Sequence, residues 1–210
     1  MNLFNKALDF IFPPICGVCG KMGENYLCYE CKEKLELISK TTYDKTNNHI
    51  WLFEYDDIRN LLLKYKFNEC SYLYKTISEF ILSNIKVRAI LNQADYIIPV
   101  PIHIKRKFER GYNQCELIAK RLSKEIDNLE YLPDVLSKKK NVVPQSILNK
   151  EERRINIQGA FYIKKYINLE EKSIILFDDI YTTGSTVNEC IRVLRKLNYK
   201  SIYIFTIAKK

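Results

Sequence analysis

Residues Ser173 to Thr186 read SIILFDDIYTTGST, an apolar run followed by two carboxylates and a turn rich in hydroxyl groups. The run from Ser173 to Phe177 has the length and the β-branched and aromatic composition of a buried strand. After the turn, apolar residues recur every three or four positions, which predicts an amphipathic helix beginning near Ser185. These apolar residues are Val187, Cys190, Ile191, Leu194 and Leu197. We therefore expect residues 178–186 to form a strand-to-helix loop.

This loop combines the features of a phosphate site and of a sugar site. Backbone N–H groups at a helix start attract anions. Hydroxyl side chains add hydrogen-bond donors, and a glycine leaves space for the ligand. The candidate phosphate-binding residues are Thr182, Thr183, Gly184, Ser185 and Thr186. Asp178 and Asp179 suit the same ligand only if they accept hydrogen bonds from sugar hydroxyls. A ribose 5-phosphate satisfies both halves, whereas the alternative, a capped helix after a strand, needs only one capping residue.

Composition indicates a globular protein with one core and a small appendage. The chain has 210 residues, 47% of them hydrophobic, and a formal net charge of +9. No stretch approaches the ~18 consecutive apolar residues that a membrane span requires, so we expect a cytoplasmic protein. Residues 1–12 predict a short amphipathic helix rather than a signal peptide, because charged and polar residues interrupt the apolar ones and no small-residue cleavage site follows.

Four cysteines form two CxxC pairs near the amino terminus: Cys16, Cys19, Cys28 and Cys31. Two such pairs within one short window, with glycines nearby for tight turns, favour a four-thiolate zinc site over a redox CxxC. A site closed by four thiolates has no open coordination position, so we predict a structural Zn²⁺ ion that folds a module too small for its own core. We expect residues 1–45 to form this module.

Residues 46–210 have the pattern of a doubly wound α/β domain with a mainly parallel sheet. Apolar runs predict strands at 50–55, 94–101, 159–164 and 201–208, and helical spacing predicts helices at 58–65, 73–85 and 115–126. The segment 102–113 is expected to be a basic loop that carries Arg106 and Arg110. If its strand lies beside 173–177 in one parallel sheet, both loops share an edge and these arginines can bind a diphosphate. The alternative is a solvated basic loop.

The segment 138–156 is polar and basic, with no sustained period. One interpretation is a hood over the site, in which Arg153 or Arg154 closes over the ligand and excludes water. The other is an exposed helix that begins near Lys150 and is stabilised by charge pairs. The sequence does not separate the two.

These motifs together resemble two related families. DDIYTTGST is similar to the loop of type I phosphoribosyltransferases that binds phosphoribosyl pyrophosphate (PRPP). The segment VPIHIKRKFERGYNQCELIAKRL, the amino-terminal cysteines and GAF at 159–161 extend the resemblance over nearly the whole chain to the ComF family, which includes ComFC and GntX-type competence proteins. The family match is most specific at Arg106, Arg110, Gly111, Asn113 and Gln114.

The resemblance implies roles for the motif residues. Asp178 and Asp179 would hold the ribose hydroxyls, Thr182 to Thr186 the 5′-phosphate, and Arg106 and Arg110 the diphosphate, together with Mg²⁺. If the protein catalyses transfer, Asp178, Asp179, Arg106 and Arg110 would be its catalytic residues. Purine-salvage members carry an aspartate where this chain has Thr182, which argues against a purine acceptor.

Three functional hypotheses follow. The resemblance implies a PRPP-binding protein that acts in DNA uptake during natural transformation, with single-stranded DNA and DNA-uptake proteins as partners. The alternatives are a metabolic phosphoribosyltransferase that acts on a nitrogen nucleophile, and a PRPP sensor without turnover. The sequence gives neither the acceptor nor the oligomeric state.

Overall fold

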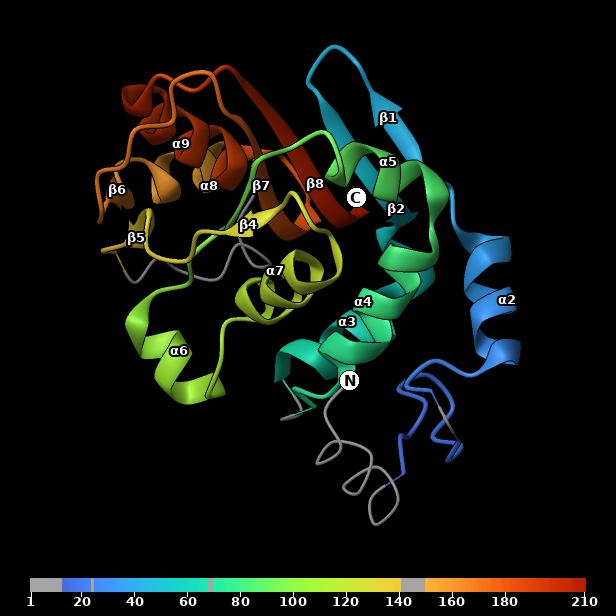
Figure 1. The fold of residues 1–210 in the computed structure, drawn as a ribbon. Helices are drawn as coiled ribbons and strands as arrows, with labels where there is room; N and C mark the ends of the chain where they lie inside the picture. Colours follow the sequence, from blue (N-terminus) through green and yellow to red (C-terminus); the bar gives the residue numbers. More distant parts are fainter. Residues whose placement is uncertain (1–12, 24, 68–69, 141–149) are drawn as a thin grey trace.

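The chain folds around a six-stranded sheet in the order β1-β2-β8-β7-β3-β4 (Figure 1). The computed structural model describes residues 13–23, 25–67, 70–140 and 150–210. The hairpin pair β1 and β2 is antiparallel and every other neighbouring pair in the sheet is parallel. The six strands are β1 (Thr42–Asp44), β2 (His49–Glu54), β3 (Tyr96–Pro99), β4 (Glu130–Tyr131), β7 (Ser173–Tyr181) and β8 (Ser201–Lys209). The predicted mainly parallel sheet is confirmed.

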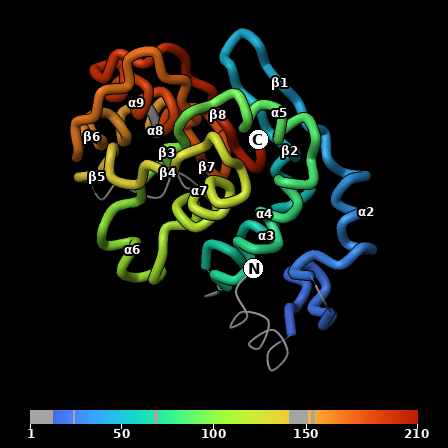
Figure 2. Tube along the Cα trace, in the orientation of Figure 1, coloured from blue at the N-terminus to red at the C-terminus, as the bar shows by residue number. Residues whose placement is uncertain are grey.

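Helices cover both faces of this sheet, as a doubly wound fold requires. Alternate residues of the central strand point to opposite sides, so Ile175 and Phe177 join one apolar cluster while Ile174 and Leu176 join the other. The helices are α2 (Tyr29–Ile38), α3 (Tyr55–Phe67), α4 (Leu73–Ser83), α5 (Ile85–Leu91), α6 (Ile104–Arg110), α7 (Gln114–Glu125), α8 (Lys150–Ile157), α9 (Ser185–Leu194) and the 3₁₀ turn η2 (Arg195–Leu197). Figure 2 traces the same path along the chain.

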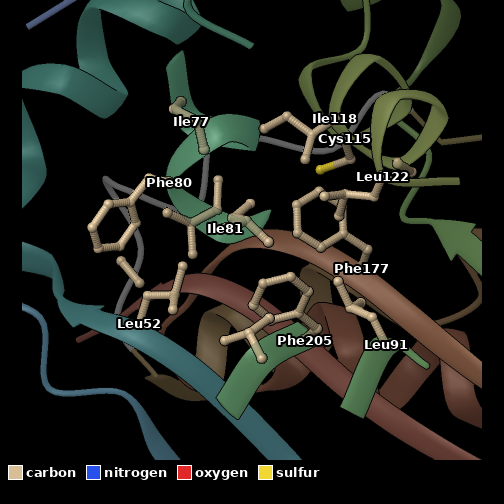
Figure 3. Packing of buried hydrophobic residues seen from close by; sticks show 14 of the residues in the cluster. Leu52, Ile77, Phe80, Ile81, Leu91, Cys115, Ile118, Leu122, Phe177 and Phe205 are labelled. Atoms are coloured by element: carbon tan, nitrogen blue, oxygen red, sulfur yellow. The ribbon is translucent and has the colours of Figure 1, made fainter. Parts of the chain in front are cut away.

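The larger cluster packs α3, α4, α5 and α7 against the sheet. Phe177 and Phe205, from neighbouring strands, lie with their ring centres 5.2 Å apart, and Ile81 and Leu122 pack over them from α4 and α7 (Figure 3). The smaller cluster holds α8, α9 and the β5–β6 pair on the other face. Each buried side chain of this size contributes about 1.5–3 kcal/mol, so the two clusters fix where every strand ends.

Three of the differences from the sequence prediction concern elements around the site and the core. The helix predicted over 73–85 ends at Ser83, because Asn84 leaves helical geometry and its side chain accepts a hydrogen bond from the Val87 N–H at 3.1 Å, starting α5. The basic loop predicted over 102–113 contains a helix, α6. The strand predicted to end at Phe177 continues to Tyr181, because β8 pairs with it through Tyr181↔Lys209.

The segment after β4 forms a small separate unit beside the main sheet. The strands β5 (Leu136–Lys138) and β6 (Phe161–Ile163) pair antiparallel. The strand predicted over 159–164 is therefore present but lies in this two-stranded sheet. Of the two interpretations of 138–156, the helix is the one found over Lys150–Ile157. Residues 141–149 and the helix predicted over residues 1–12 lie outside the described residues.

The cysteine-rich segment packs directly against the main core. Leu27 and Leu35 belong to the same apolar cluster as Leu73 and Ile77 of α4. The Thr76 hydroxyl donates a hydrogen bond to the Tyr26 carbonyl at 2.6 Å, which ties the segment to α4. The domain boundary predicted after residue 45 stays a prediction; β1, which precedes it, is a strand of the main sheet.

Gly17 is the point of closest approach between this segment and α4. A Cβ atom there would lie 2.3 Å from Leu73 Cδ2 and 2.5 Å from Thr76 Oγ1. We predict that Gly17→Ala lowers the free energy of unfolding by about 1–3 kcal/mol, because α4 and the segment must move apart. Denaturant unfolding followed by circular dichroism measures the change.

The matched control is Gly23→Ala, because a Cβ at Gly23 meets nothing within 4 Å. Equal stability of the two variants would show that the segment does not pack on α4 in solution.

Candidate functional site

The four cysteines of the CxxC pairs converge at one point. Their sulfur atoms all lie within 4.8 Å of one another, and Cys16 and Cys31 are buried. The Cys16 carbonyl accepts a hydrogen bond from the Gly20 N–H at 2.8 Å, which folds the first pair into a tight turn, and Cys31 lies in the first turn of α2. Four clustered thiols fit a tetrahedral Zn²⁺ ion with sulfur ligands.

The acidic pair lies at the carboxyl end of the central strand. Asp178 and Asp179 are strand residues of β7, and the loop predicted over 178–186 is shorter because β7 continues to Tyr181; α9 begins at Ser185, as predicted. Gly184 adopts a positive φ of 73°, and a Cβ there would lie 2.3 Å from the Tyr181 hydroxyl oxygen. Only glycine therefore allows this turn between strand and helix.

The basic segment lies at the same edge of the sheet as the acidic pair. β3 pairs in parallel with β7 from Tyr96↔Ile174 to Pro99↔Phe177, so residues after Pro99 emerge beside Asp178. His103 begins α6 by accepting a hydrogen bond from the Lys105 N–H at 3.2 Å. This capping is a structural role, and it leaves the arginines of α6 to face the cavity.

The two segments line one cavity of about 470 Å³. Both the acidic pair and the two arginines, Arg106 and Arg110, line it. From the predicted phosphate turn, Thr182 and Thr186 line the cavity, whereas Thr183, Gly184 and Ser185 shape the turn behind it; the Thr183 and Ser185 hydroxyl oxygens lie 2.8 Å apart. The structure thus brings all the predicted ligand-binding segments together.

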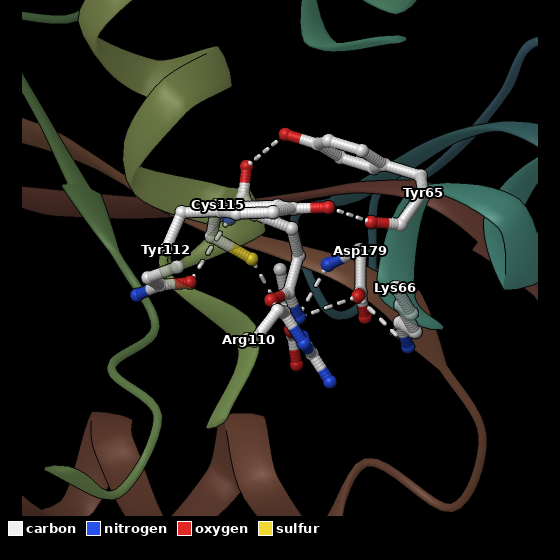
Figure 4. A network of polar contacts seen from close by, with 9 residues as sticks. Tyr65, Lys66, Arg110, Tyr112, Cys115 and Asp179 are labelled. Carbon is white, nitrogen blue, oxygen red and sulfur yellow. Dashed lines mark hydrogen bonds and ion pairs between the residues drawn. The ribbon is translucent and has the colours of Figure 1, made fainter. Parts of the chain in front are cut away.

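Asp179 is the centre of a polar network that connects three elements (Figure 4). Its Oδ2 atom accepts hydrogen bonds from Lys66 Nζ of α3 and from Gln114 Nε2 of α7, both at 2.8 Å. The Gln114 side-chain oxygen in turn accepts a hydrogen bond from Arg110. The ion pair between Lys66 and Asp179 is mostly buried, so removing either partner would leave an uncompensated charge.

Asp178 is the less compensated of the two carboxylates. Burial and the neighbouring charge of Asp179 raise its pKa to about 7. Its Oδ1 atom accepts hydrogen bonds from the Asp179 N–H at 2.9 Å and from the Cys115 thiol at 3.7 Å. A ligand that brings hydroxyl donors or a cation to this carboxylate would favour its ionised form.

Two lysines of the cavity were missed by the sequence prediction. Lys66 reaches the acidic pair only because α3 packs beside β8, and no local pattern marks it. Lys138 comes from β5, and burial together with the charge of Arg106 lowers its pKa to about 8. Gln114 was noticed as part of a motif, but its contact with Asp179 depends on the placement of α7.

Comparisons with known proteins agree with this arrangement. The double zinc ribbon domain family matches residues 7–44, and the phosphoribosyl transferase domain family matches residues 113–210. Competence protein F of Haemophilus influenzae is 29% identical over 93% of this chain and 85% of its own length. Competence protein ComFC of Streptococcus pneumoniae is 28% identical over 77% of this chain and 68% of its own length. DNA utilization protein YhgH of Escherichia coli K12 is 23% identical over 71% of this chain and 66% of its own length.

Fold, cysteine cluster and comparisons define a phosphoribosyltransferase-type α/β protein with an amino-terminal zinc ribbon. Within that class, the predicted resemblance to the ComF family is confirmed by relatives named competence protein F and ComFC. Among the residues that the structure describes, no helix is both long and apolar enough to cross a bilayer.

Zinc content offers a direct test of the cysteine cluster. We predict about one Zn²⁺ ion per chain, and loss of that ion together with a lower melting temperature in Cys16→Ser, because three thiolates hold the metal less tightly. Metal analysis of the purified protein and thermal denaturation measure both quantities.

Cys70→Ser is the control, because Cys70 lies outside the cluster. A protein without bound zinc whose melting temperature is the same in both variants would rule out a structural metal.

Proposed function

We propose that the protein binds PRPP with Mg²⁺ in the cavity at the carboxyl edge of the sheet. The observation that carries this proposal is that two carboxylates, two arginines and two threonines of the helix-starting turn all line one cavity. A ribose with phosphates at both ends needs this distribution: acceptors for hydroxyls in the middle and donors or cations on each side.

Each segment has a role in this proposal. Asp178 and Asp179 accept hydrogen bonds from the ribose hydroxyls, and residues 182–186 donate hydrogen bonds to the 5′-phosphate from the α9 start. Arg106 and Arg110 bind the diphosphate, because the guanidinium fork matches phosphate oxygens. Burial and the charge of Asp179 raise the pKa of Asp178, so a cation nearby would favour its ionised form; a Mg²⁺ ion there would also neutralise diphosphate oxygens.

We also propose that the protein acts on DNA during natural transformation, in the cytoplasm and with DNA-uptake proteins as partners. The names of the relatives support competence and DNA utilization as the setting. The helix α6 offers a physical reason, since it buries none of its residues and carries four cations. Ile104 and Phe108, one turn apart, are 70% and 90% exposed. An exposed aromatic ring among cations is typical of single-strand binding, where bases stack and phosphates pair.

Two alternatives use the same cavity. A metabolic enzyme would transfer ribose 5-phosphate to a nitrogen nucleophile and release pyrophosphate, and a sensor would bind PRPP without turnover. Pyrophosphate release over a panel of bases and amines separates them, because only the enzyme produces it.

Calorimetric titration with PRPP and Mg²⁺ tests the ligand. We predict binding that requires Mg²⁺ and that weakens by about 10- to 100-fold in Asp179→Asn, because hydrogen bonds from the ribose to a charged carboxylate are lost. Asp127→Asn, which changes an exposed carboxylate outside the cavity, is the matched control. Equal affinity for PRPP in the wild type and in Asp179→Asn would show that the acidic pair does not bind the ribose.

Salt dependence tests the single-strand proposal. We predict that the affinity for an oligonucleotide falls with salt on a log–log slope of about −0.7 for each phosphate neutralised. Phe108→Ala should cost about 1–3 kcal/mol of binding free energy, because one stacked base is lost. Tyr166→Ala, at a 71% exposed aromatic residue away from α6, is the control. A flat salt response, or equal losses in both variants, would contradict binding through α6.

A further inference from the structure

One wall of the cavity has no role in the PRPP proposal. It is formed by one face of α3, where Tyr55 and Arg59 are one turn apart, and by the residue that follows β8. We call it the α3 wall, and its residues are Tyr55, Arg59, Leu62, Leu63, Lys66, Phe67 and Lys210.

Sheet topology places one end of the α3 wall, at Tyr55 and Lys210, across the acidic pair from the proposed diphosphate site. In the strand order β2-β8-β7-β3, the acidic pair lies on β7 and the basic helix α6 follows β3. Tyr55 directly follows β2, and Lys210 directly follows β8. The parallel strands end at one edge, so Tyr55 and Lys210 lie across Asp178 and Asp179 from α6, whereas Phe67 at the other end of α3 reaches Arg110.

That position is where an acceptor must enter. When a nucleophile displaces pyrophosphate from C1 of the ribose, it approaches from the side opposite the leaving group. With the ribose on Asp178 and Asp179 and the diphosphate on α6, the free side of C1 faces α3. We therefore expect the α3 wall to position the nucleophile against C1.

The side chains of the α3 wall indicate which kind of acceptor molecule could bind there. Leu63 and the ring of Tyr55 offer apolar surface for a flat molecule, and the Lys210 ammonium lies 5.7 Å from the centre of the Tyr55 ring. Phe67 is 68% exposed at the rim, with the Arg110 guanidinium 5.4 Å from its ring centre.

The charged residues of the α3 wall are all cations. The cations Arg59, Lys66 and Lys210 face the cavity, and no acidic residue belongs to the α3 wall. The acids Asp56 and Asp57 instead line a separate groove beside the zinc-binding segment. An apolar shelf edged only with cations suits a planar molecule with a negative charge.

We propose that the α3 wall is the acceptor subsite and that it takes a small heteroaromatic carboxylic acid with a nucleophilic ring nitrogen. This inference rests on the proposed PRPP site. The ring nitrogen's lone pair forms a bond to C1 while the bond from C1 to the diphosphate oxygen breaks, and that bonding pair leaves with pyrophosphate. A hydrogen on the nitrogen, where present, passes to water. Arg59 binds the carboxylate, and Tyr55 and Leu63 pack on the ring.

Lys66 connects this subsite to the ribose site. Its ammonium group pairs with Asp179 at 2.8 Å and also lines the α3 wall. Ribose hydroxyls bound to Asp179 would compete for that carboxylate, and Lys66 would then be available to the acid. Acceptor and PRPP should therefore bind with positive coupling, so that each raises the affinity of the other by the same factor.

Matched acids and amides test the subsite. Pyridine-3-carboxylate and pyridine-3-carboxamide, and a pyrimidine carboxylate and its amide, are titrated into the full-length zinc-loaded protein with and without Mg²⁺ and pyrophosphate. We expect each acid to bind at least about tenfold more tightly than its amide, because only the acid forms charge-assisted hydrogen bonds. Pyrophosphate release from PRPP is then measured with each acid.

Arg59→Gln and Arg88→Gln form a charge-matched pair. Both residues are exposed, and Arg88 of α5 lies outside the cavity. We expect Arg59→Gln to weaken acid binding at least about fivefold more than it weakens PRPP binding, and Arg88→Gln to change neither.

The contrary results are distinct from failure of the PRPP site. If PRPP binds but acids and amides bind equally or not at all, the acceptor inference is wrong. The same conclusion follows if Arg59→Gln weakens PRPP as much as the acid, because Arg59 would then belong to the diphosphate site. If Arg59→Gln weakens only the binding of single-stranded DNA, the α3 wall binds a DNA strand instead of a small acid. If PRPP itself does not bind, the proposed function is wrong. The ratio of the affinities for each acid and its amide still tests whether the α3 wall binds an acid.

Discussion

The parallel pairing of β3 with β7 is the contact on which the candidate site depends. It aligns Pro99 with Phe177, and the Val100 N–H extends it by donating to the Phe177 carbonyl at 2.8 Å. The pairing makes a basic helix and an acidic pair, 70 residues apart in sequence, emerge at one edge of the sheet. Asn113 then fixes the return of the chain, because its side-chain amide donates to the Val100 carbonyl at 3.1 Å.

The central site also shows how the fold balances charge. Two adjacent carboxylates at the end of a buried strand repel each other, and the structure supplies one buried ion pair, from Lys66 to Asp179. Its neighbour Asp178 is buried as well, and burial together with the charge of Asp179 raises the pKa of Asp178. Because burial is the first cause of that raised pKa, hydroxyl donors or a cation in direct contact with Asp178 would favour its ionised form, and a ribose with a bound cation brings both. Stability and ligand binding are therefore linked at the same carboxylate.

The residues that sequence reasoning found are those with a local pattern. The apolar run before Asp178, the helical spacing after Ser185 and the paired cysteines each carry their structure within a few residues, so strand, helix and metal cluster were predictable. Lys66 and Lys138 were missed because their place in the cavity depends on how α3 and β5 pack against distant strands. The helix α6 was mistaken for a loop because it buries no residue, which removes the apolar period that marks a helix.

Deuterium exchange followed by mass spectrometry tests most directly whether the two segments form one ligand site. With PRPP and Mg²⁺ present, backbone amides in residues 101–113 and in residues 178–190 should both become protected from exchange. The protection of both segments should saturate at the same PRPP concentration. Ribose 5-phosphate, which lacks the diphosphate, should protect 178–190 and leave 101–113 unchanged. Protection of only one segment by PRPP, or of neither, would contradict a single site formed by β3 and β7.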